Sequence, residues 1–322
     1  MDITERVRDE IIKDVELKFG MKIQNAIPIN LGYANLKWIM ETNIGPIFVK
    51  QYDKVRYRRG LDGVELALNY QNKMHSEGIP CQPVIEFKGI CIHTTSTGES
   101  YMISGVSKGK LVEPGEINND QMHSLGEATG RMHKWMQINM PRLPILQWEL
   151  PSKEKKLEDL RINYIETQQA NNQKYLTAIE EQEKILGSFD LENLKSCCVQ
   201  GWAHWDMHLD NLLFYNDGLA DILDFDRLHY VYMEFDISRA ILSGAMRRNE
   251  INLEATRSYI EGYRNHIELL PEQLVRSVKL TWYKEFSWVT EKFRDDKAMS
   301  RFIDEMIWIG KEWDNLEDIF NV

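Results

Sequence analysis

The sequence contains three oxygen-bearing side chains, Asp206, Asn211 and Asp224, whose types and spacing could perform chemistry together. Asn211 follows Asp206 by five residues, and Asp224 ends an apolar segment thirteen residues later. A carboxylate beside a hydroxyl group can orient that hydroxyl and accept its proton. An amide oxygen and a second carboxylate suit a hard cation such as Mg²⁺. The pattern therefore predicts a base, Asp206, and two metal ligands, Asn211 and Asp224, as phosphoryl transfer requires.

A lysine in the first part of the chain could supply the positive charge that such chemistry needs. Lys50 follows the apolar residues 47–49, and an ammonium group there could bind the α and β phosphates of a nucleotide. Glu65, on the helix expected next, is the predicted partner that holds Lys50 in place. Asp62 and Glu77 are the alternatives for that role.

Gly32 and Asn35 lie in a short turn between two expected strands. Because glycine lets the backbone approach a ligand closely, a phosphate could bind at this turn. The turn does not have the G-x-G-x-x-G pattern, and by itself it predicts only a hairpin.

Other polar residues surround the segment 204–211, called the catalytic loop below. Asp226 would face the same side as the metal-binding aspartate if the strand continued, and could support a second metal or the loop. Asp236 is interpreted as a helix N-cap or as a buried anchor for the catalytic loop. His204 is expected to brace the loop by hydrogen bonding. His208 is expected either to contact the nucleotide or substrate, or to lie in solvent.

The elements that must position these residues begin with a strand-rich segment. Short apolar runs alternate with turns in the first third of the chain, which predicts a small antiparallel sheet with one main helix. A preceding helix is expected at 4–19, where apolar residues recur every three or four positions. The expected strands are 26–31, 36–42, 47–52, 84–87, 90–93 and 101–104, and the expected main helix is 62–75.

The remainder of the chain has a helical character. Aliphatic residues keep returning in the charged segment 152–195, which predicts two surface helices and not disorder. Short strands at 199–203 and 220–223 are expected to bracket the catalytic loop. From residue 235 onward the sequence is again helical and rich in aromatic residues.

These patterns predict an α+β fold with two lobes. Residues 1–104 form the expected nucleotide-binding lobe, and residues 105–322 form a larger, mostly helical lobe that carries the catalytic and substrate-binding residues. The hinge is expected near 104–110, and 152–195 is expected to be a helical insertion.

Composition limits the partners and the location of the protein. The net charge of −11 argues against a nucleic-acid partner, because phosphate backbones select basic surfaces. The acidity is compatible with a cationic or polyhydroxyl substrate, and it is also ordinary for a soluble protein. No C-x-x-C pair is present among the four cysteines. No segment resembles a signal peptide or approaches the ~20 apolar residues of a membrane span. We expect a cytoplasmic protein with no membrane partner, and leave its oligomeric state open.

From about residue 25 to residue 245, the chain resembles the aminoglycoside phosphotransferase and choline-kinase-like group of small-molecule kinases. The matching segments are 31–35, 48–50, 78–80, an LGxxLxxLH-like helix at 125–133, the catalytic loop and 222–226. The resemblance implies a two-lobed kinase-like fold that uses Mg²⁺ with ATP or GTP. It also implies that the backbone at Ser104 and Val106 forms a hinge that holds the adenine.

Two residues depart from the pattern of this group. The group usually has glycine between the histidine and aspartate of the catalytic loop, where this chain has Trp205, and its bulk could change the loop or wall off the acceptor pocket. The group commonly has tryptophan or tyrosine where Phe225 stands, which is a mild change. Neither departure removes a reacting group. An alternative is therefore a kinase-like binding or structural protein with little turnover.

Two rival enzyme classes can be weighed against a kinase. On a strand, the alternating catalytic-loop residues would line one face like a metallohydrolase site: His204, Asp206, His208 and Asp210. No further His or Cys cluster supplies a third ligand region for that site. Asp224 could instead be the nucleophile of a phosphatase that forms an aspartyl-phosphate. That fold needs parallel strands where this chain is helical and aromatic.

The acceptor of the phosphoryl group is open at this point. The helices after Asp236 are expected to wall its pocket, and their aromatic residues are expected to be mostly core. One or two of these rings could stack on a cationic or sugar substrate. The candidates are an aminoglycoside, another antibiotic, a choline-like amino alcohol, an amino-acid hydroxyl and a sugar.

Overall fold

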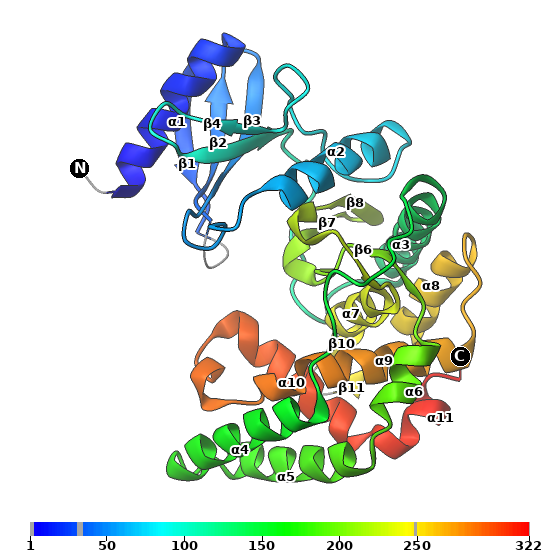
Figure 1. Cartoon of the computed structure of the whole chain (residues 1–322). Coiled ribbons are helices and arrows are strands. Elements are labelled where there is room, and N and C mark those ends of the chain that lie inside the picture. Colours follow the sequence, from blue (N-terminus) through cyan, green and yellow to red (C-terminus); the bar gives the residue numbers. More distant parts are fainter. Residues whose placement is uncertain (1–2, 31–34, 248–249, 322) are drawn as a thin grey trace. The chain divides into compact units, whose positions relative to one another are not determined.

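The computed structural model describes residues 3–30, 35–247 and 250–321 (Figure 1). The chain divides into two compact units, called unit 1 and unit 2 below. Unit 1 contains Met1–Lys110 and Ala220–Leu228, and unit 2 contains Leu111–Leu219 and His229–Val322. The segment Ala220–Leu228 therefore belongs to unit 1, although the residues on either side of it belong to unit 2.

Unit 1 is built on an antiparallel sheet (Figure 1). The sheet has five strands in the order β1-β2-β3-β5-β4. In chain order, its elements are α1 (Ile3–Phe19), β1 (Ile23–Pro28), β2 (Lys37–Thr42), β3 (Gly45–Tyr52), α2 (Asp62–Ser76), β4 (Ile92–Thr94), β5 (Ser100–Ser104) and the 3-10 helix η2 (Phe225–Arg227).

The two faces of this sheet pack on different helices, because successive side chains of a strand point to opposite faces. On one face, Val49 of β3 belongs to a buried cluster with Ile11 of α1. On the other face, Tyr52 of β3 belongs to a buried cluster with Leu68 of α2. Lys50 lies two residues before Tyr52, so it shares the face that α2 covers.

The expected elements of unit 1 are present with shifted ends, except in one region. The predicted strands at 84–87 and 90–93 are mostly wrong. Val84 makes only an isolated bridge to Ser104, and Phe87 pairs only with Ile90. A tight turn joins these last two residues, and the regular strand β4 begins later, at Ile92.

Unit 2 is mostly helical (Figure 1). Its helices are α3 (Asn119–Asn139), α4 (Lys153–Gln169), α5 (Gln173–Ser188), α6 (Leu191–Cys197), α7 (Glu234–Ala245), α8 (Leu253–Arg264), α9 (Pro271–Glu285), α10 (Lys297–Lys311) and α11 (Leu316–Ile319), with 3-10 turns η1 (Leu209–Asn211), η3 (Phe286–Trp288), η4 (Glu291–Phe293) and η5 (Trp313–Asn315). Its short strands are β6 (Gln200–Ala203), which pairs with β9 (His229–Tyr232), β7 (Leu212–Tyr215), and β10 (Met246–Arg247), which pairs with β11 (Glu250–Ile251). Strand β8 (Gly218–Ile222), the partner of β7, begins in unit 2 and ends in the segment that belongs to unit 1. An antiparallel sheet and a mostly helical unit confirm the predicted α+β class.

Helices α3 and α8 approach each other so closely that both need glycine at the contact. A Cβ atom at Gly126 would lie 1.9 Å from the carbonyl oxygen of Tyr259. A Cβ atom at Gly262 would lie 2.1 Å from the carbonyl oxygen of His123. The two backbones therefore touch directly, and this contact fixes the pair of helices in unit 2.

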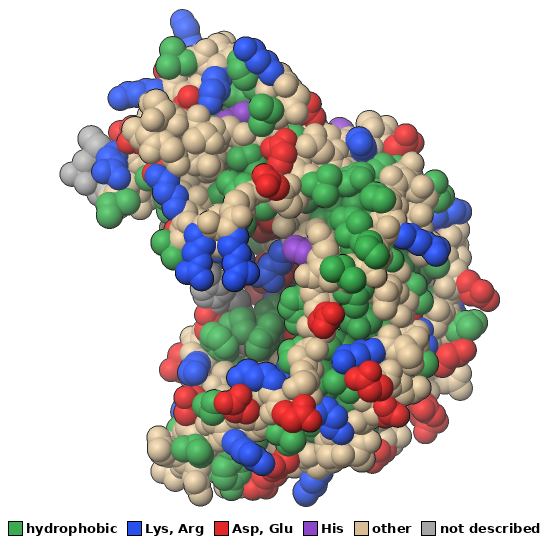
Figure 2. All heavy atoms as spheres, in the orientation of Figure 1, with side chains coloured by type: hydrophobic (Ala, Val, Ile, Leu, Met, Phe, Trp, Pro, Cys, Tyr) green, Lys and Arg blue, Asp and Glu red, His purple; other side chains and the backbone are tan. Residues whose placement is uncertain are grey.

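The charged segment 152–195 folds into α4, α5 and the start of α6. Leu160, Tyr175 and Leu186 of this segment are buried, whereas Ile162 and Ile165 of α4 are exposed. Side chains of both charges are interspersed over the outer surface of α4 and α5 (Figure 2). The segment therefore forms the two expected helices, but the aliphatic residues of α4 do not all lie on its buried face. No helix in the described ranges combines the length and apolar composition that crossing a bilayer requires.

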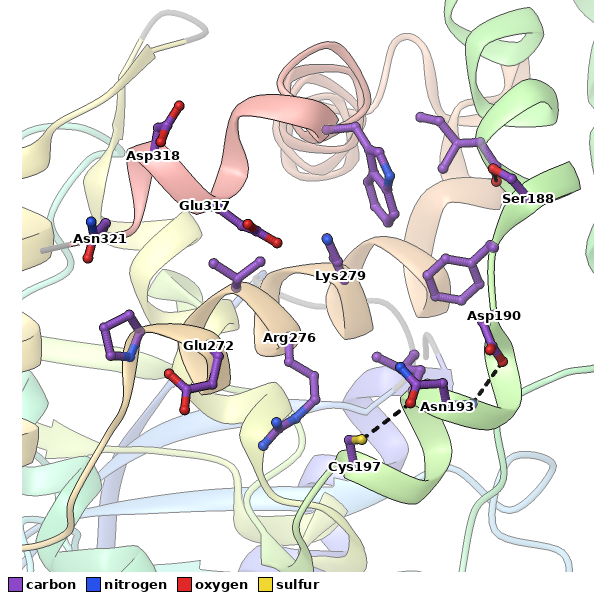
Figure 3. Close-up of a pocket in the computed structure, with 16 residues that line it drawn as sticks. Ser188, Asp190, Asn193, Cys197, Glu272, Arg276, Lys279, Glu317, Asp318 and Asn321 are labelled. Carbon is purple, nitrogen blue, oxygen red and sulfur yellow. Dashed lines mark hydrogen bonds between the residues drawn. The ribbon is translucent and has the colours of Figure 1, made fainter.

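A cavity of about 730 Å³ lies in unit 2 among α5, α6, α9 and α11 (Figure 3). Arg276 and Lys279 of α9 and Glu317 of α11 point into it (Figure 3). The Lys279 ammonium lies 5.3 Å from the centre of the Trp313 ring. The described lining of this cavity includes no residue of the catalytic loop.

Candidate nucleotide-binding and catalytic residues

Unit 1 brings Lys50 together with the aspartates of segment 220–228. The Lys50 side chain is 6% exposed, and its Nζ lies 2.7 Å from Asp224 Oδ1 and 2.5 Å from Asp226 Oδ2. The Asp224 carboxylate keeps 27% of its surface exposed, whereas that of Asp226 keeps 7%. Asp224 can therefore accept a further ligand, and Asp226 serves mainly to hold the lysine.

The backbone at Asp224 directs both carboxylates to the lysine. Strand β8 ends at Ile222, whose N–H donates to the carbonyl of Pro80 at 2.8 Å. Asp224 then adopts φ 62° and ψ 58°, and η2 begins. The strand does not continue to Asp226, as the prediction required, yet its carboxylate faces the same ammonium group as that of Asp224. The Asp226 carboxylate reaches Lys50 through the left-handed turn and is fixed by the Tyr52 hydroxyl at 3.1 Å.

The charge of Lys50 is stabilised by its two partners. Burial of the ammonium alone would lower the pKa of Lys50, but the carboxylates of Asp226 and Asp224 raise it above its ordinary value. Lys50 is therefore a permanent, preoriented cation in unit 1, as a phosphate-binding group must be.

The predicted pair between Lys50 and Glu65 is wrong. The two carboxylate oxygens of Glu65 accept the backbone N–H groups of Cys91 at 2.9 Å and Ile92 at 2.8 Å. Glu65 thus fixes the start of β4 on α2, while the carboxylates of Asp224 and Asp226 accept the hydrogen bonds of the Lys50 ammonium.

Four other residues are proposed for nucleotide binding: Gly32, Asn35, Ser104 and Val106. Gly32 lies outside the described residues. Asn35 accepts the backbone N–H of Asp53 at 3.2 Å, which ties the turn after β1 to the end of β3. Ser104 ends β5 and is buried, and Val106 follows it with its side chain half-buried. Their roles as a hinge stay predictions.

In unit 2, the catalytic loop presents Asp206 and Asn211 to one another. The Asn211 amide nitrogen donates to the Asp206 carboxylate at 3.0 Å and to the Asp206 carbonyl at 3.0 Å. This fixes the amide so that its oxygen points away from Asp206. The loop is a turn that leads into η1 and not a strand, so its alternating His and Asp residues do not line one face.

His208 lies between the carboxylates of Asp206 and Asp210 in the same loop. Its Nε2 is 3.3 Å from Asp206 Oδ1, and its Nδ1 is 3.5 Å from Asp210 Oδ2. Burial would lower the pKa of His208, but hydrogen bonds to both carboxylates raise it. The hydrogen bond from His208 and the charge of Arg301, 3.0 Å away, lower the pKa of Asp210 to about 2. Ionic contacts thus link Asp206 to α10.

Asp236 anchors the catalytic loop, which decides between its two predicted roles. It is fully buried inside α7, where Met233 is the N-cap. Its carboxylate accepts the backbone N–H of His204 at 2.7 Å and that of Trp205 at 2.8 Å. The buried His133 of α3 lies 3.1 Å from the same carboxylate. The loop is therefore fixed by a buried carboxylate, and His204 is braced through its backbone.

Trp205 adopts φ 66°, the left-handed region that favours glycine. This is the position at which the kinase group usually has glycine, so the backbone keeps the shape that glycine would permit. The indole is 7% exposed and packs on Phe235 at 4.6 Å and on Trp148 at 5.3 Å between ring centres.

Sequence reasoning missed several residues that hold these groups in place. In unit 1, Gln82 donates to the buried carboxylate of Asp221 at 2.9 Å, and Ser107 donates to the same oxygen. In unit 2, the Ser243 hydroxyl accepts the N–H of Leu209 at 3.0 Å. Gln82, Asp221 and Ser243 are polar residues among apolar ones, and Ser107 lies in a polar segment; neither signal identifies the partner.

The donor atoms suit a hard divalent cation. Asp224 in unit 1 offers a partly exposed carboxylate, and Asn211 in unit 2 offers an amide oxygen. Magnesium prefers oxygen ligands of these two kinds. The residues of each unit therefore fit the metal that the motif implies.

A family model described as the phosphotransferase enzyme family matches residues 25–269. No match was found among curated proteins. Similar solved structures include spectinomycin phosphotransferase in complex with ADP and spectinomycin, at 16% identity over 97% of each chain with a TM-score of 0.63. A microcompartment-associated aminopropanol kinase is 15% identical over 99% of each chain, with a TM-score of 0.65. Amicoumacin kinase with AMP-PNP and Ca²⁺ is 18% identical over 98% of this chain and 96% of the other, with a TM-score of 0.59.

The solved structures share the fold of this chain, and the family match covers most of its length. The chain belongs to the phosphotransferase enzyme family, which confirms the predicted resemblance, the kinase-like fold and the assignment as a phosphotransferase.

Proposed function

We propose that the protein transfers the γ-phosphoryl group of ATP or GTP to a hydroxyl group of a small molecule, with Mg²⁺ as the metal. The observation that carries this proposal is the ion pair of unit 1, in which the buried Lys50 ammonium lies 2.7 Å from the partly exposed Asp224 carboxylate. This pair matches the lysine and metal-binding aspartate of kinase chemistry. The complexes of similar proteins with ADP and with AMP-PNP and Ca²⁺ support a nucleotide and a divalent cation.

Each proposed role follows from the chemistry of the residue. Asp206 orients the acceptor hydroxyl and takes its proton while the oxygen bonds to the γ-phosphorus and the bond to the nucleoside diphosphate breaks. Lys50 binds the α and β phosphates. Asn211 and Asp224 are the residues that would offer oxygen ligands to Mg²⁺, and the bound metal would neutralise phosphate charge.

The remaining roles concern the nucleotide and the lobes. We assign residues 1–104 to nucleotide binding and residues 105–322 to catalysis and acceptor binding. In this assignment, the backbone at Ser104 and Val106 holds the adenine, and Gly32 and Asn35 are given a role in phosphate binding.

The test combines nucleotide binding with transfer to a panel of hydroxylated acceptors. The variant Asp206→Asn should bind Mg²⁺ and ATP like the wild type and lose transfer by about 10²–10⁴-fold, because it lacks the base. Calorimetry measures the binding, and ADP formation measures the transfer. Full transfer by this variant would refute the role of Asp206. A wild-type chain that binds nucleotide but transfers to no acceptor would favour a kinase-like binding protein instead.

A further inference from the structure

An aromatic cluster lies directly beside the proposed base. The indole of Trp205, the residue before Asp206, packs between Phe235 of α7 and Trp148. Trp205 holds a backbone conformation that glycine adopts at lower cost, so the side chain has a role that offsets this cost. Trp148 and Trp288 are both partly exposed, so the cluster presents aromatic surface to a ligand.

Three rings of this region surround the ammonium group of Lys284. Its Nζ lies 3.9 Å from the ring centre of Phe235, 4.9 Å from that of Trp205 and 5.9 Å from that of Trp288. The Lys284 side chain is 13% exposed, and Nζ lies 3.1 Å from Glu285. Aromatic cages of this kind bind the ammonium groups of ligands. Here the protein's own lysine occupies the place of a ligand cation.

The surrounding carboxylates are already engaged. Four carboxylates in the described part of unit 2 have cationic or amide partners: Glu285 has Arg239 and Lys284, Glu305 has Arg239, Asp210 has Arg301, and Asp206 has Asn211. A polycationic ligand needs surplus carboxylates, and the engaged groups here do not supply them. Three cations, Arg239, Lys284 and Arg301, thus balance three of these four carboxylates, so this cluster is much less negative than the chain with its net charge of −11.

We propose that the acceptor is a neutral or anionic hydroxyl compound that carries no ammonium group next to the reacting hydroxyl. The inference rests on the proposed function and narrows its acceptor. Lys284 repels a ligand ammonium from the cage beside Asp206. The partly exposed rings of Trp148 and Trp288 contact the carbon skeleton, and Lys284 and its three rings set the charge specificity.

Matched acceptors test the charge directly. The compounds 1-amino-2-propanol, 1,2-propanediol and lactate share three carbons and a hydroxyl on the second carbon, and carry a positive, zero and negative charge. Glucosamine, glucose and gluconate repeat the comparison on six carbons. We expect kcat/KM for the neutral or anionic member to exceed that for the amine by about tenfold or more, because like charges at such distances repel in a partly buried site.

Variants of α9 assign the effect to one lysine. Lys284→Met should shift the ratio of kcat/KM by about tenfold toward the amine, since one charge is removed, and Lys284→Arg should keep the wild-type ratio. Lys279→Met is the matched control, because Lys279 lies on the same helix and also over a tryptophan ring, but lines the separate cavity of Figure 3. It should leave the ratio unchanged. Thermal unfolding verifies that each variant is folded.

The outcomes separate the inference from the proposed function. Three outcomes would each overturn the inference. The first is best transfer to the amines, and the second is an unchanged ratio of kcat/KM in a folded Lys284→Met variant. The third is nucleotide binding by the wild type without transfer to any neutral or anionic acceptor. Absence of Mg²⁺-dependent nucleotide binding in the wild type would overturn the proposed function itself, and the inference with it.

Discussion

Asp224 and Trp205 each place an L-amino acid in the left-handed backbone region, with φ of 62° and 66°. Such a conformation costs about 1–2 kcal/mol for a residue with a Cβ atom. At Asp224, the turn directs the carboxylate to Lys50. At Trp205, it lets the backbone N–H reach Asp236 while the indole packs beside the proposed base. Strain at these two residues therefore coincides with the groups proposed to react.

The role of Asp224 as a metal ligand can be measured separately from that of the base. Asp224→Ala should lower the affinity for Mg²⁺ in the presence of ATP by more than about 100-fold, because a direct ligand is lost. Asp226 still holds Lys50 in this variant. Titration of ADP formation against Mg²⁺ gives the result. Asp217→Ala is the control, because it removes an exposed carboxylate of the β7–β8 turn, and it should respond to Mg²⁺ like the wild type. A wild-type Mg²⁺ response in Asp224→Ala would show that Asp224 is not a metal ligand.

The pKa of His208 depends on its carboxylate neighbours. Hydrogen bonds to Asp206 and Asp210 raise this pKa, against the opposing effect of burial. Asp210→Asn removes one of these charges, so the pKa of His208 should fall toward its ordinary value. The contact between the protonated His208 and its carboxylates stabilises the folded chain at low pH and is lost as the pH rises through this pKa. In Asp210→Asn, that loss should therefore occur at a lower pH than in the wild type. NMR titration of the imidazole measures the shift, and an unchanged pKa would contradict the effect of Asp210.

Among the elements, the α3–α8 contact is the most sensitive to an added methyl group. Gly126→Ala places a Cβ atom against the Tyr259 carbonyl, so the helices must separate. We expect a loss of about 3 kcal/mol in the free energy of unfolding. Gly187→Ala on α5 is the matched control, since nothing lies within 4 Å of its Cβ position, and it should stabilise the protein by up to about 1 kcal/mol. Chemical denaturation compares both, and equal stability of the two variants would contradict the close contact.

Lys156 joins α4 to the end of α9 with its ammonium buried. Its Nζ donates to the Lys284 carbonyl at 2.9 Å and to the Ser287 hydroxyl at 3.1 Å. Burial lowers the pKa of Lys156 from its ordinary 10.5 to about 8. Between these pH values the unfolded chain binds more protons than the folded chain, so the free energy of unfolding should increase as pH rises.

The full effect of Lys156 is about 3 kcal/mol between pH 8 and 10.5. Lys156→Met should abolish this increase, whereas Lys155→Met, at an exposed lysine of the same helix, should retain it. Urea denaturation at several pH values measures the slope. A wild-type slope in Lys156→Met would mean that the lysine stays charged throughout.

For the whole molecule, local patterns predict more than contacts between distant segments. The spacing within the catalytic loop predicts Asp206 and Asn211 because both lie on one short turn. The partner of Lys50 could not be predicted from the sequence. The left-handed turn at Asp224 brings the carboxylates to Lys50, and the Glu65 carboxylate instead accepts backbone N–H groups. The α+β class follows from periodicity, but the direct contact of Gly126 with α8 depends on packing that one sequence does not reveal.

The assignment of segment Ala220–Leu228 to unit 1 has a consequence for synthesis of the chain. Residues up to Lys110 emerge from the ribosome first, yet the carboxylates that neutralise Lys50 lie 174 and 176 positions after it. Until segment 220–228 is translated, the Lys50 ammonium lacks both carboxylates on the face of the sheet that is buried in the folded unit. The first unit can thus mature only after much of the second has been translated, and a cut at residue 110 would not yield an autonomous module.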